Sequence, residues 1–373
     1  TLVTDEKHSF YIRLNLTRFL AQEVQRPELF DYAPKWYEEN RIEILTSSRV
    51  IGLDPIKKTA LLQEGRELPY DACILTHGSS ASTPPFYRAD LPGVYMLRTL
   101  EDVEGIAGLV KAGMKVAVIG GGVLGLEAAY GLVKHGASVK VFEYLPRLMP
   151  RQLDITGAEL FTRMVREKDI ESFTGVGVKE LIGGDRVNGL ILSDGRRFDA
   201  DLVVVSTGIK PNIDWVKRSG IDCQRGVLVD DRMQTSADGV YAAGDVVEWR
   251  GQVVGLWTNA IEQAKVAAAN AVGKMAFFQG FLPVTILKCL GIALTSIGEI
   301  PEDGNGITSK IKHDPEARTY RRLILREGIP IGGILLGTSA GMGDMRKLIE
   351  NGLELEKLRK KVAPDEELVA ATR

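Results

Sequence analysis

Three glycines in the middle of the chain have the spacing Gly-x-Gly-x-x-Gly, at Gly120, Gly122 and Gly125. In this spacing the first glycine permits a tight turn, the second lets backbone approach a pyrophosphate, and the third lets a helix lie close to a sheet. Glu143 follows eighteen residues after Gly125, where its carboxylate can accept hydrogen bonds from ribose hydroxyls and repel a 2′-phosphate. These residues predict a dinucleotide site that favours NAD over NADP.

Further residues near this loop complete the predicted NAD site. Val123 and Leu124 lie between the second and third glycines of the pattern. Glu127, on the first turn of the predicted helix, either complements the helix dipole or lies beside the nicotinamide. Gly208 follows a later apolar strand, where a glycine lets backbone approach a ligand. Arg147, in the segment after the acidic residue, leaves the use of NADP beside NAD open.

A second group of chemical interest is the pair Gly244 and Asp245, in the segment TSADGVYAAGDVV. A short apolar strand delivers this aspartate to a strand end, where a carboxylate can hold the hydroxyls of a polyol. An ordinary surface turn is the alternative interpretation.

The three cysteines, Cys73, Cys223 and Cys289, lie far apart and form no paired motif, so we predict neither a metal site nor a redox disulfide among them.

Regular elements must position these residues. Residues 115–119 form an apolar, β-branched stretch that predicts a strand, 126–136 have helical spacing that ends at a glycine, and 138–143 predict the next strand. The segment GRELPYDACILTHG at 65–78 matches GRRFDADLVVVSTG at 195–208 in spacing. In each copy an acidic residue and a glycine predict a hairpin turn, and an apolar strand ends before a second glycine. The chain therefore carries one nucleotide-binding module twice.

The first copy enters only at LVTDE, which is typical of the second strand of such a module. We expect its first strand, glycine-rich loop and helix to precede Thr1. Without that loop, which would hold a pyrophosphate, the chain should bind its first dinucleotide weakly.

Composition limits the partners. The 373 residues are 45% hydrophobic and carry a formal net charge of −2, which gives no broad basic field for nucleic acid. The sequence lacks an apolar run of about 18 residues and a leader pattern. We therefore predict a cytoplasmic protein with no membrane span, two or three domains, and small-molecule or protein partners.

Several motifs together resemble a known family. YAAGDV, THGS, STGIKPN, GGGVLGLE and WTNAIEQAKVAAANAVG occur in the order found in the FAD- and NAD(P)-dependent pyridine nucleotide-disulfide oxidoreductases. The chain most resembles the rubredoxin reductase and nitrite reductase flavoprotein branch, which works without a redox disulfide. The resemblance implies an α/β fold with two Rossmann-like domains and a small α+β C-terminal domain. The implied boundaries are 1–104 with 233–280 for the FAD-binding domain, 105–232 for the NAD-binding domain and 281–373 for the C-terminal domain.

The same resemblance implies a set of FAD-binding residues. They are Glu6 at the adenosine ribose, Val50 at the adenine, Arg13 near the phosphates, Thr76 and Gly78 after a strand, Gly244 with Asp245 at the ribityl chain, and Trp257 and Thr258 with Asn259 near the isoalloxazine. His77 departs from the family pattern and is interpreted as a spacer rather than an acid or base. Arg18 lies where relatives carry a lysine or an acid, so no role is assigned to it.

The C-terminal region changes pattern. Alternating residues predict strands around a Gly-Ile-Pro turn at 328–330, and 342–352 predict a helix ended by Gly352. A charged, solvated helix interrupted by Pro364 should follow. The resemblance implies that this domain covers the flavin and helps to form an oligomer or acceptor interface; simply completing the core is the alternative.

The predicted activity is an NADH-dependent flavoprotein oxidoreductase. Hydride passes from NADH to FAD, and electrons then pass to a redox protein acceptor, either a rubredoxin-like carrier or an Fe–S or metalloenzyme partner subunit. No catalytic side chain and no metal are required. A homodimer or a place in a hetero-oligomer is compatible with this activity, but the sequence does not determine the oligomeric state. The alternatives are an NADH oxidase or disulfide reductase, which the lack of a cysteine in the stretch EKHSFYIRLNLTRF disfavours, and a flavin-free NAD-binding subunit.

Overall fold

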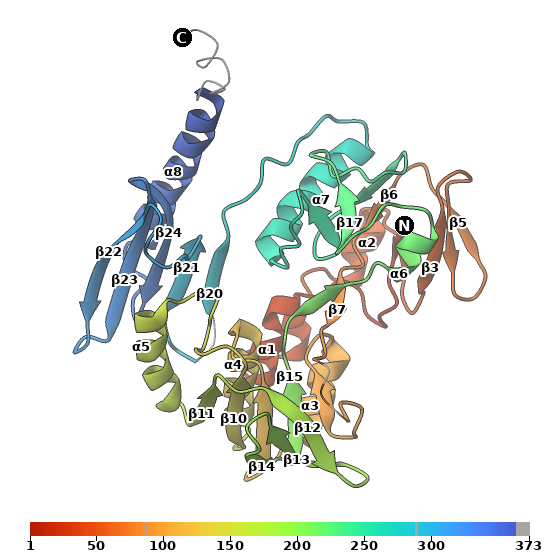
Figure 1. Cartoon of the computed structure of the whole chain (residues 1–373). Helices are drawn as coiled ribbons and strands as arrows, with labels where there is room; N and C mark the ends of the chain where they lie inside the picture. The colour runs from red at the N-terminus through yellow and green to blue at the C-terminus, as the bar shows by residue number, and fades with distance from the viewer. Residues whose placement is uncertain (85, 87, 288–289, 363–373) are drawn as a thin grey trace. The chain divides into compact units, whose positions relative to one another are not determined.

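The computed structural model describes residues 1–84, 86, 88–287 and 290–362 (Figure 1). The chain forms two compact units. Unit 1 comprises Thr1–Pro84, Met96–Gly105 and Thr207–Phe281, and unit 2 comprises Pro85–Tyr95, Ile106–Ser206 and Leu282–Arg373. Residues 207–232, which we predicted within the NAD-binding domain, thus pack with unit 1. The boundaries of the three functional domains stay a prediction.

The central sheet of unit 2 has five strands in the order β11-β10-β9-β15-β8. Their bounds are Ile170–Thr174, Ser138–Glu143, Lys115–Ile119, Leu202–Val205 and Val94–Met96. β9 pairs in parallel with both β10 and β15, and its last four residues are buried. Such a continuous apolar run is expected of a strand that is covered on both faces.

Helix α4 (Val123–Lys134) connects β9 to β10, and its next residues, His135 and the left-handed Gly136 (φ +79°), end it as predicted. α5 (Ile155–Arg166) connects β10 to β11 and begins after Asp154, whose side chain accepts a hydrogen bond from the N–H of Gly157. α3 (Leu100–Leu109) precedes β9 along the chain. The strand, loop, helix and strand predicted around the glycines are therefore confirmed.

Unit 1 contains several short parallel pairs. β1 (Leu2–Val3) pairs with β2 (Ile44–Leu45), β6 (Cys73–Leu75) with β18 (Val240–Ala242), and β17 (Val227–Val229) with β19 (Val247–Trp249). The helices of this unit include η1 (Arg13–Asn15), α1 (Leu16–Leu20), η2 (Arg26–Leu29), α2 (Pro34–Glu39), α6 (Asp214–Arg218) and α7 (Trp257–Ala271). Buried residues of β3 (Val50–Asp54), β6, α6 and β18, among them Leu53, Leu75, Val216 and Val240, share one hydrophobic cluster.

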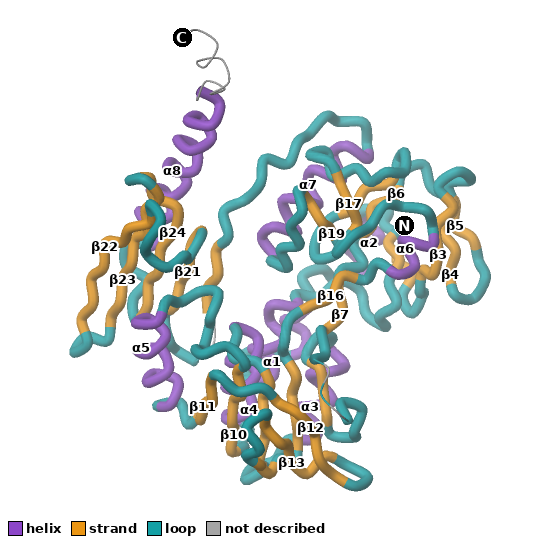
Figure 2. The backbone as a smooth tube through the Cα atoms, in the orientation of Figure 1, coloured by secondary structure: helices purple, strands orange, loops and turns teal. Residues whose placement is uncertain are grey.

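The sequence repeat corresponds to repeated structure, whose strands are orange in Figure 2 like all strands of the chain. In unit 1, β3 (Val50–Asp54), β4 (Thr59–Leu62) and β5 (Glu67–Pro69) form an antiparallel sheet that precedes β6. In unit 2, β12 (Val178–Gly183), β13 (Val187–Leu192) and β14 (Arg197–Asp199) form an equivalent sheet that precedes β15. Gly65 and Gly195 occupy the same left-handed conformation in the two hairpins, at φ +86° and +87°. Both predicted hairpins are confirmed.

The C-terminal part of unit 2 is a five-stranded antiparallel sheet in the order β20-β21-β24-β23-β22 (Figure 1). The strands are Val284–Leu287, Leu294–Gly298, Ile329–Leu336, Thr319–Arg326 and Ile307–Asp314. The predicted Gly-Ile-Pro turn is displaced toward the N-terminus, because Glu327 and Gly328 both have positive φ and form the two-residue turn themselves. Ile329 and Pro330 already belong to β24.

The predicted helix end at Gly352 is wrong, because α8 runs from Met342 to Val362. A Cβ atom at Gly352 would lie 2.1 Å from the carbonyl oxygen of Pro330, so this glycine lets the helix pack closely on β24. Pro364 and Cys289 lie outside the described residues.

Candidate functional site

The glycine-rich loop of unit 2 is built from close backbone contacts. A Cβ atom at Gly120 would lie 2.0 Å from the carbonyl oxygen of Ser206, and Gly120 has φ +118°. A Cβ atom at Gly125 would lie 2.0 Å from the carbonyl oxygen of Gly120. Backbone atoms cannot rotate away as a side chain can, so both positions require glycine and α4 lies directly against the end of β9.

Gly122 differs from these two glycines. It is the N-cap residue of α4 with φ −83°, and a Cβ atom there would meet nothing within 4 Å. No side chain caps the first turn, Val123 is half-buried and Leu124 is exposed. The N-terminus of α4 is therefore uncapped and the space beside Gly122 is open, as a site for pyrophosphate at a helix N-terminus requires.

Glu143 ends β10 and is buried beside the loop. Its two carboxylate oxygens accept hydrogen bonds from the N–H groups of Gly121, at 2.6 Å, and Leu145, at 2.8 Å. Each oxygen can accept a further bond, so the carboxylate is held in place and can still bind ribose hydroxyls. Glu127 is the fifth residue of α4 and buried, so the prediction that it lies on the first turn is wrong.

Gly208 belongs to unit 1, whereas the other seven predicted NAD residues belong to unit 2. Its φ is +106°, and a Cβ atom there would meet nothing within 4 Å. Its carbonyl oxygen accepts a hydrogen bond from the N–H of Ser82 at 2.9 Å.

In unit 1 the structure brings Glu6 and Arg13 together. Arg13 donates to one carboxylate oxygen of Glu6, and the hydroxyl of Tyr11 donates to the other at 2.5 Å. Tyr11 is buried, and burial raises the pKa of its hydroxyl well above the ordinary value, so it stays a donor at neutral pH. The second guanidinium nitrogen of Arg13 donates to the carbonyl oxygen of Arg98 at 2.8 Å.

Arg98 connects this group to Asp245. Its guanidinium donates to the carboxylate of Asp245 at 2.9 Å and to both oxygens of Ser79, at 2.9 Å and 3.1 Å, and the Ser79 hydroxyl also donates to Asp245 at 3.0 Å. The sequence interpretation missed Arg98. The signal was the following Thr99-x-x-Asp102 pattern, since Asp102 accepts from the N–H groups of both Arg98 and Thr99 at the start of α3.

Two glycines adjoin this network. Gly78 has φ +67°, and a Cβ atom there would lie 3.6 Å from the guanidinium of Arg98. Gly244 has φ +85°, and its N–H donates to the side chain of Gln263 on α7 at 2.9 Å. Asp245 directly follows it. Arg98 therefore brings Glu6, Arg13, Gly78 and Asp245 into one connected polar group, as a ligand with phosphate and hydroxyl groups requires.

His77 lies in a different environment from the exposed Thr76 before it. The ring nitrogen Nε2 of His77 lies 2.8 Å from the carbonyl oxygen of Asn212, and the ring packs on Trp215 with 4.7 Å between centroids. Burial lowers the pKa of the imidazole below its ordinary value, so it is neutral at pH 7. These contacts fix the residue and support its interpretation as a spacer.

The N-terminus of α7 holds the other predicted FAD residues. Trp257 begins the helix, no side chain caps its first turn, and Thr258 is exposed. Asn259 is buried and its Oδ1 has no hydrogen-bond partner, an acceptor that a bound ligand or water would satisfy. The uncapped turn and this open acceptor are compatible with the predicted cofactor.

The other predicted positions are less informative. Val50 opens β3 opposite Leu62, and Arg18 forms an ion pair with Glu23 at 3.4 Å.

Burial raises the pKa of the Cys73 thiol to about 11 and also raises that of Cys223, so both thiols are protonated at neutral pH. Neither is a ready nucleophile.

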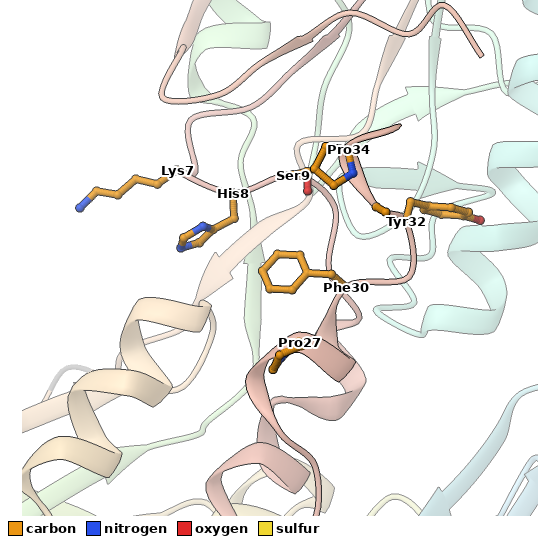
Figure 3. Close-up of a pocket in the computed structure, with 8 residues that line it drawn as sticks. Lys7, His8, Ser9, Pro27, Phe30, Tyr32 and Pro34 are labelled. Carbon is orange, nitrogen blue, oxygen red and sulfur yellow. The ribbon is translucent and has the colours of Figure 1, made fainter. Parts of the chain in front are cut away.

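Unit 1 also contains a cavity of about 480 Å³, shown in Figure 3. Its lining residues are Lys7, His8, Ser9, Pro27, Phe30, Tyr32, Ala33 and Pro34. The rings of His8 and Phe30 meet edge to face at 6.1 Å, and the lining includes none of the predicted FAD residues.

Within the described part of the chain, no helix combines the length and the apolar character needed to cross a bilayer.

The sequence matches two family models. The family described as pyridine nucleotide-disulphide oxidoreductase matches residues 1–270, and the rubredoxin NAD+ reductase C-terminal domain matches residues 283–353. The nitrite reductase [NAD(P)H] of Bacillus subtilis is 34% identical over 96% of this chain, which covers 45% of that relative. The NADH-rubredoxin oxidoreductase of Clostridium acetobutylicum is 30% identical over 91% of this chain and 86% of its own length. The chain thus spans less than half the length of the nitrite reductase.

Solved structures agree. The crystal structure of the Clostridium acetobutylicum NADH:rubredoxin oxidoreductase has a TM-score of 0.77 at 26% identity, covering 94% of this chain and 88% of that one. A ferredoxin reductase from Rhodopseudomonas palustris has a TM-score of 0.82 at 28% identity, covering 91% and 85%. These matches confirm the predicted two-dinucleotide fold, and the matched family uses FAD and NAD(H). The chain belongs to the pyridine nucleotide-disulphide oxidoreductase family.

Proposed function

We propose that this chain oxidises NADH through FAD and delivers the electrons to a protein acceptor, either a rubredoxin-like carrier or an Fe–S or metalloenzyme partner subunit. The observation that carries the proposal is the loop of unit 2. An uncapped helix N-terminus, an unobstructed Gly122 and an anchored Glu143 together fit a pyrophosphate and an adenosine ribose without a 2′-phosphate.

The residues of the chain would bind and orient the two cofactors. In unit 2, Gly122 and the first turn of α4 would hold the NADH pyrophosphate, and Glu143 would hold its ribose. In unit 1, Asp245 would bind FAD hydroxyls in an orientation fixed by Arg98 and Ser79. When bound, FAD supplies the capacity to accept hydride and to release electrons singly.

The protein acceptor is favoured by the relatives. The matched proteins are named for rubredoxin, for nitrite and for electron transfer to nitrate reductase, and residues 283–353 match a rubredoxin reductase domain. The protonated thiols of Cys73 and Cys223 give no support to disulfide chemistry at either residue.

The test is the visible spectrum of the chain, loaded with FAD, before and after anaerobic addition of NADH or NADPH. We expect the flavin band to bleach with NADH and then to recover on addition of oxidised rubredoxin. Recovery only on admission of oxygen, with hydrogen peroxide or water as product, would replace the proposal with an NADH oxidase. Failure to take up FAD while still binding NAD+ would indicate the flavin-free alternative.

A further inference from the structure

The loop between β10 and α5, which follows Glu143, is held by the C-terminal sheet at its far end. Asp154 accepts a hydrogen bond from the Tyr320 hydroxyl at 2.5 Å, and the guanidinium of Arg322 lies 3.2 Å from the same carboxylate oxygen. Tyr320 and Arg322 are on β23 and fully buried, at 0% and 2% exposure. A buried ion pair with these extra hydrogen bonds fixes the end of the loop.

Arg322 also fixes a second segment of the C-terminal region. Its guanidinium donates to the carbonyl oxygen of Pro301 at 3.0 Å and to the carboxylate of Asp303 at 2.7 Å, while its Nε donates to Ser309 at 2.8 Å. Residues on both sides of Glu302 are therefore bonded to one buried side chain. The backbone that carries Glu302 is consequently held in position relative to Asp154.

Glu302 meets Arg147 from this position. The carboxylate of Glu302 lies 3.3 Å from the Arg147 guanidinium, whose Nε also donates to the carbonyl oxygen of Leu153 at 3.0 Å. Arg147 is the first of two arginines, with Arg151, in the loop after Glu143. An arginine in such a loop can accept the 2′-phosphate of NADP. Here its charge is paired and its side chain is turned along its own loop.

We propose that Glu302 is a positioning residue that withholds Arg147 from a 2′-phosphate, so that the C-terminal sheet contributes to the preference for NAD over NADP. The inference rests on the proposed dinucleotide site. It adds to Glu143, whose carboxylate repels a 2′-phosphate directly. Arginine binds phosphate well when its donors are free, so the pairing with Glu302 determines whether this one is available.

The test is calorimetric titration of the FAD-loaded chain with NAD+ and with NADP+. Glu302→Gln should strengthen NADP+ binding about threefold, the size expected for release of an exposed ion pair. The affinity for NAD+ should stay unchanged. Glu299→Gln is the matched control, because it removes another exposed carboxylate of the segment between β21 and β22, the partner of Arg326, and should alter neither affinity.

A double-mutant cycle separates the proposed route from simple charge removal. In an Arg147→Gln background, Glu302→Gln should no longer strengthen NADP+ binding. An equal gain in both backgrounds would show that Glu302 repels the phosphate without acting through Arg147, and unchanged NADP+ affinity in the single variant would also overturn the inference. If the unaltered chain did not bind NAD+, the dinucleotide site itself would be refuted.

Discussion

Gly122 caps α4 and Gly125 lies in its first turn, and the structure predicts that alanine will have opposite effects at the two positions. At Gly125 a Cβ atom would lie 2.0 Å from the Gly120 carbonyl oxygen, so α4 and β9 must separate by about 1 Å to reach the 3.0 Å limit of real contacts. Overpacking of this kind costs about 1–3 kcal/mol. At Gly122 the new methyl group meets nothing. Alanine is a poorer N-cap residue than glycine, which destabilises the helix, but it also lowers the conformational entropy of the unfolded chain, which stabilises the fold. The two effects roughly cancel, so the free energy of unfolding changes by about 0.5 kcal/mol or less.

Gly122→Ala should affect NAD+ affinity, although it leaves the stability of the fold nearly unchanged. The methyl group of Gly122→Ala would lie where the pyrophosphate must approach the backbone, so we expect NAD+ affinity to fall at least about tenfold, or roughly 1.4 kcal/mol. The assay is a urea unfolding midpoint together with calorimetric NAD+ titration for both variants. Gly125→Ala should lower the midpoint, whereas Gly122→Ala should leave it in place while weakening NAD+. Wild-type NAD+ affinity in Gly122→Ala would refute the assignment of this loop as the pyrophosphate site.

Three further predictions follow from the networks around the two sites. Tyr320→Phe removes the hydroxyl that donates to the buried Asp154 carboxylate and should cost about 1–3 kcal/mol, seen as a lower urea midpoint. Arg98→Gln leaves Asp245 without its ion pair and should weaken FAD binding about tenfold, measured by flavin release on dilution; unchanged release would refute the positioning role of Arg98. Because burial lowers the pKa of His77, the unfolded chain binds more protons just below pH 6.5, so stability should fall as pH falls from that value. His77→Phe should flatten this part of the pH profile of the unfolding midpoint, and an unaltered slope would show that His77 does not contribute to it.

The parts of the site that sequence analysis could predict are those determined by local backbone. Gly125 is required by its close contact with the carbonyl oxygen of Gly120, Gly120 itself has a positive φ, and Glu143 ends the next strand of the same unit. Spacing along the chain therefore determines their positions in space. The hairpin turns at Gly65 and Gly195 were predictable for the same reason, since each needs only its own positive φ.

Residues whose role depends on distant partners could not be predicted in this way. Arg98 acts on Asp245, 147 residues later, and nothing in its own neighbourhood indicates that partner. Gly352 has the sequence context of a helix end, yet a contact with Pro330 on β24 explains it. In both cases the deciding atom belongs to another element, so the local pattern did not identify the partner.

Equivalent residues of the two copies of the repeat also contact each other. The two copies are offset by 130 residues, from Gly78 to Gly208, and the short strands that follow, β7 (Ser79–Ala81) and β16 (Ile209–Pro211), pair antiparallel with each other. Ser80 lies opposite Lys210, which is its own equivalent in the other copy.

The flanking hydrogen bonds obey the same relation. The N–H of Ser82 donates to Gly208, and the N–H of Asn212, the equivalent of Ser82, donates to Gly78, the equivalent of Gly208. These two backbone hydrogen bonds thus form a pair with the roles exchanged, as in a contact with twofold symmetry. A left-handed glycine is needed at the start of both short strands because both must leave their parent strands in the same direction to meet. The duplicated Gly78 and Gly208 are therefore explained by the pairing of the two copies, independently of any ligand that either glycine approaches.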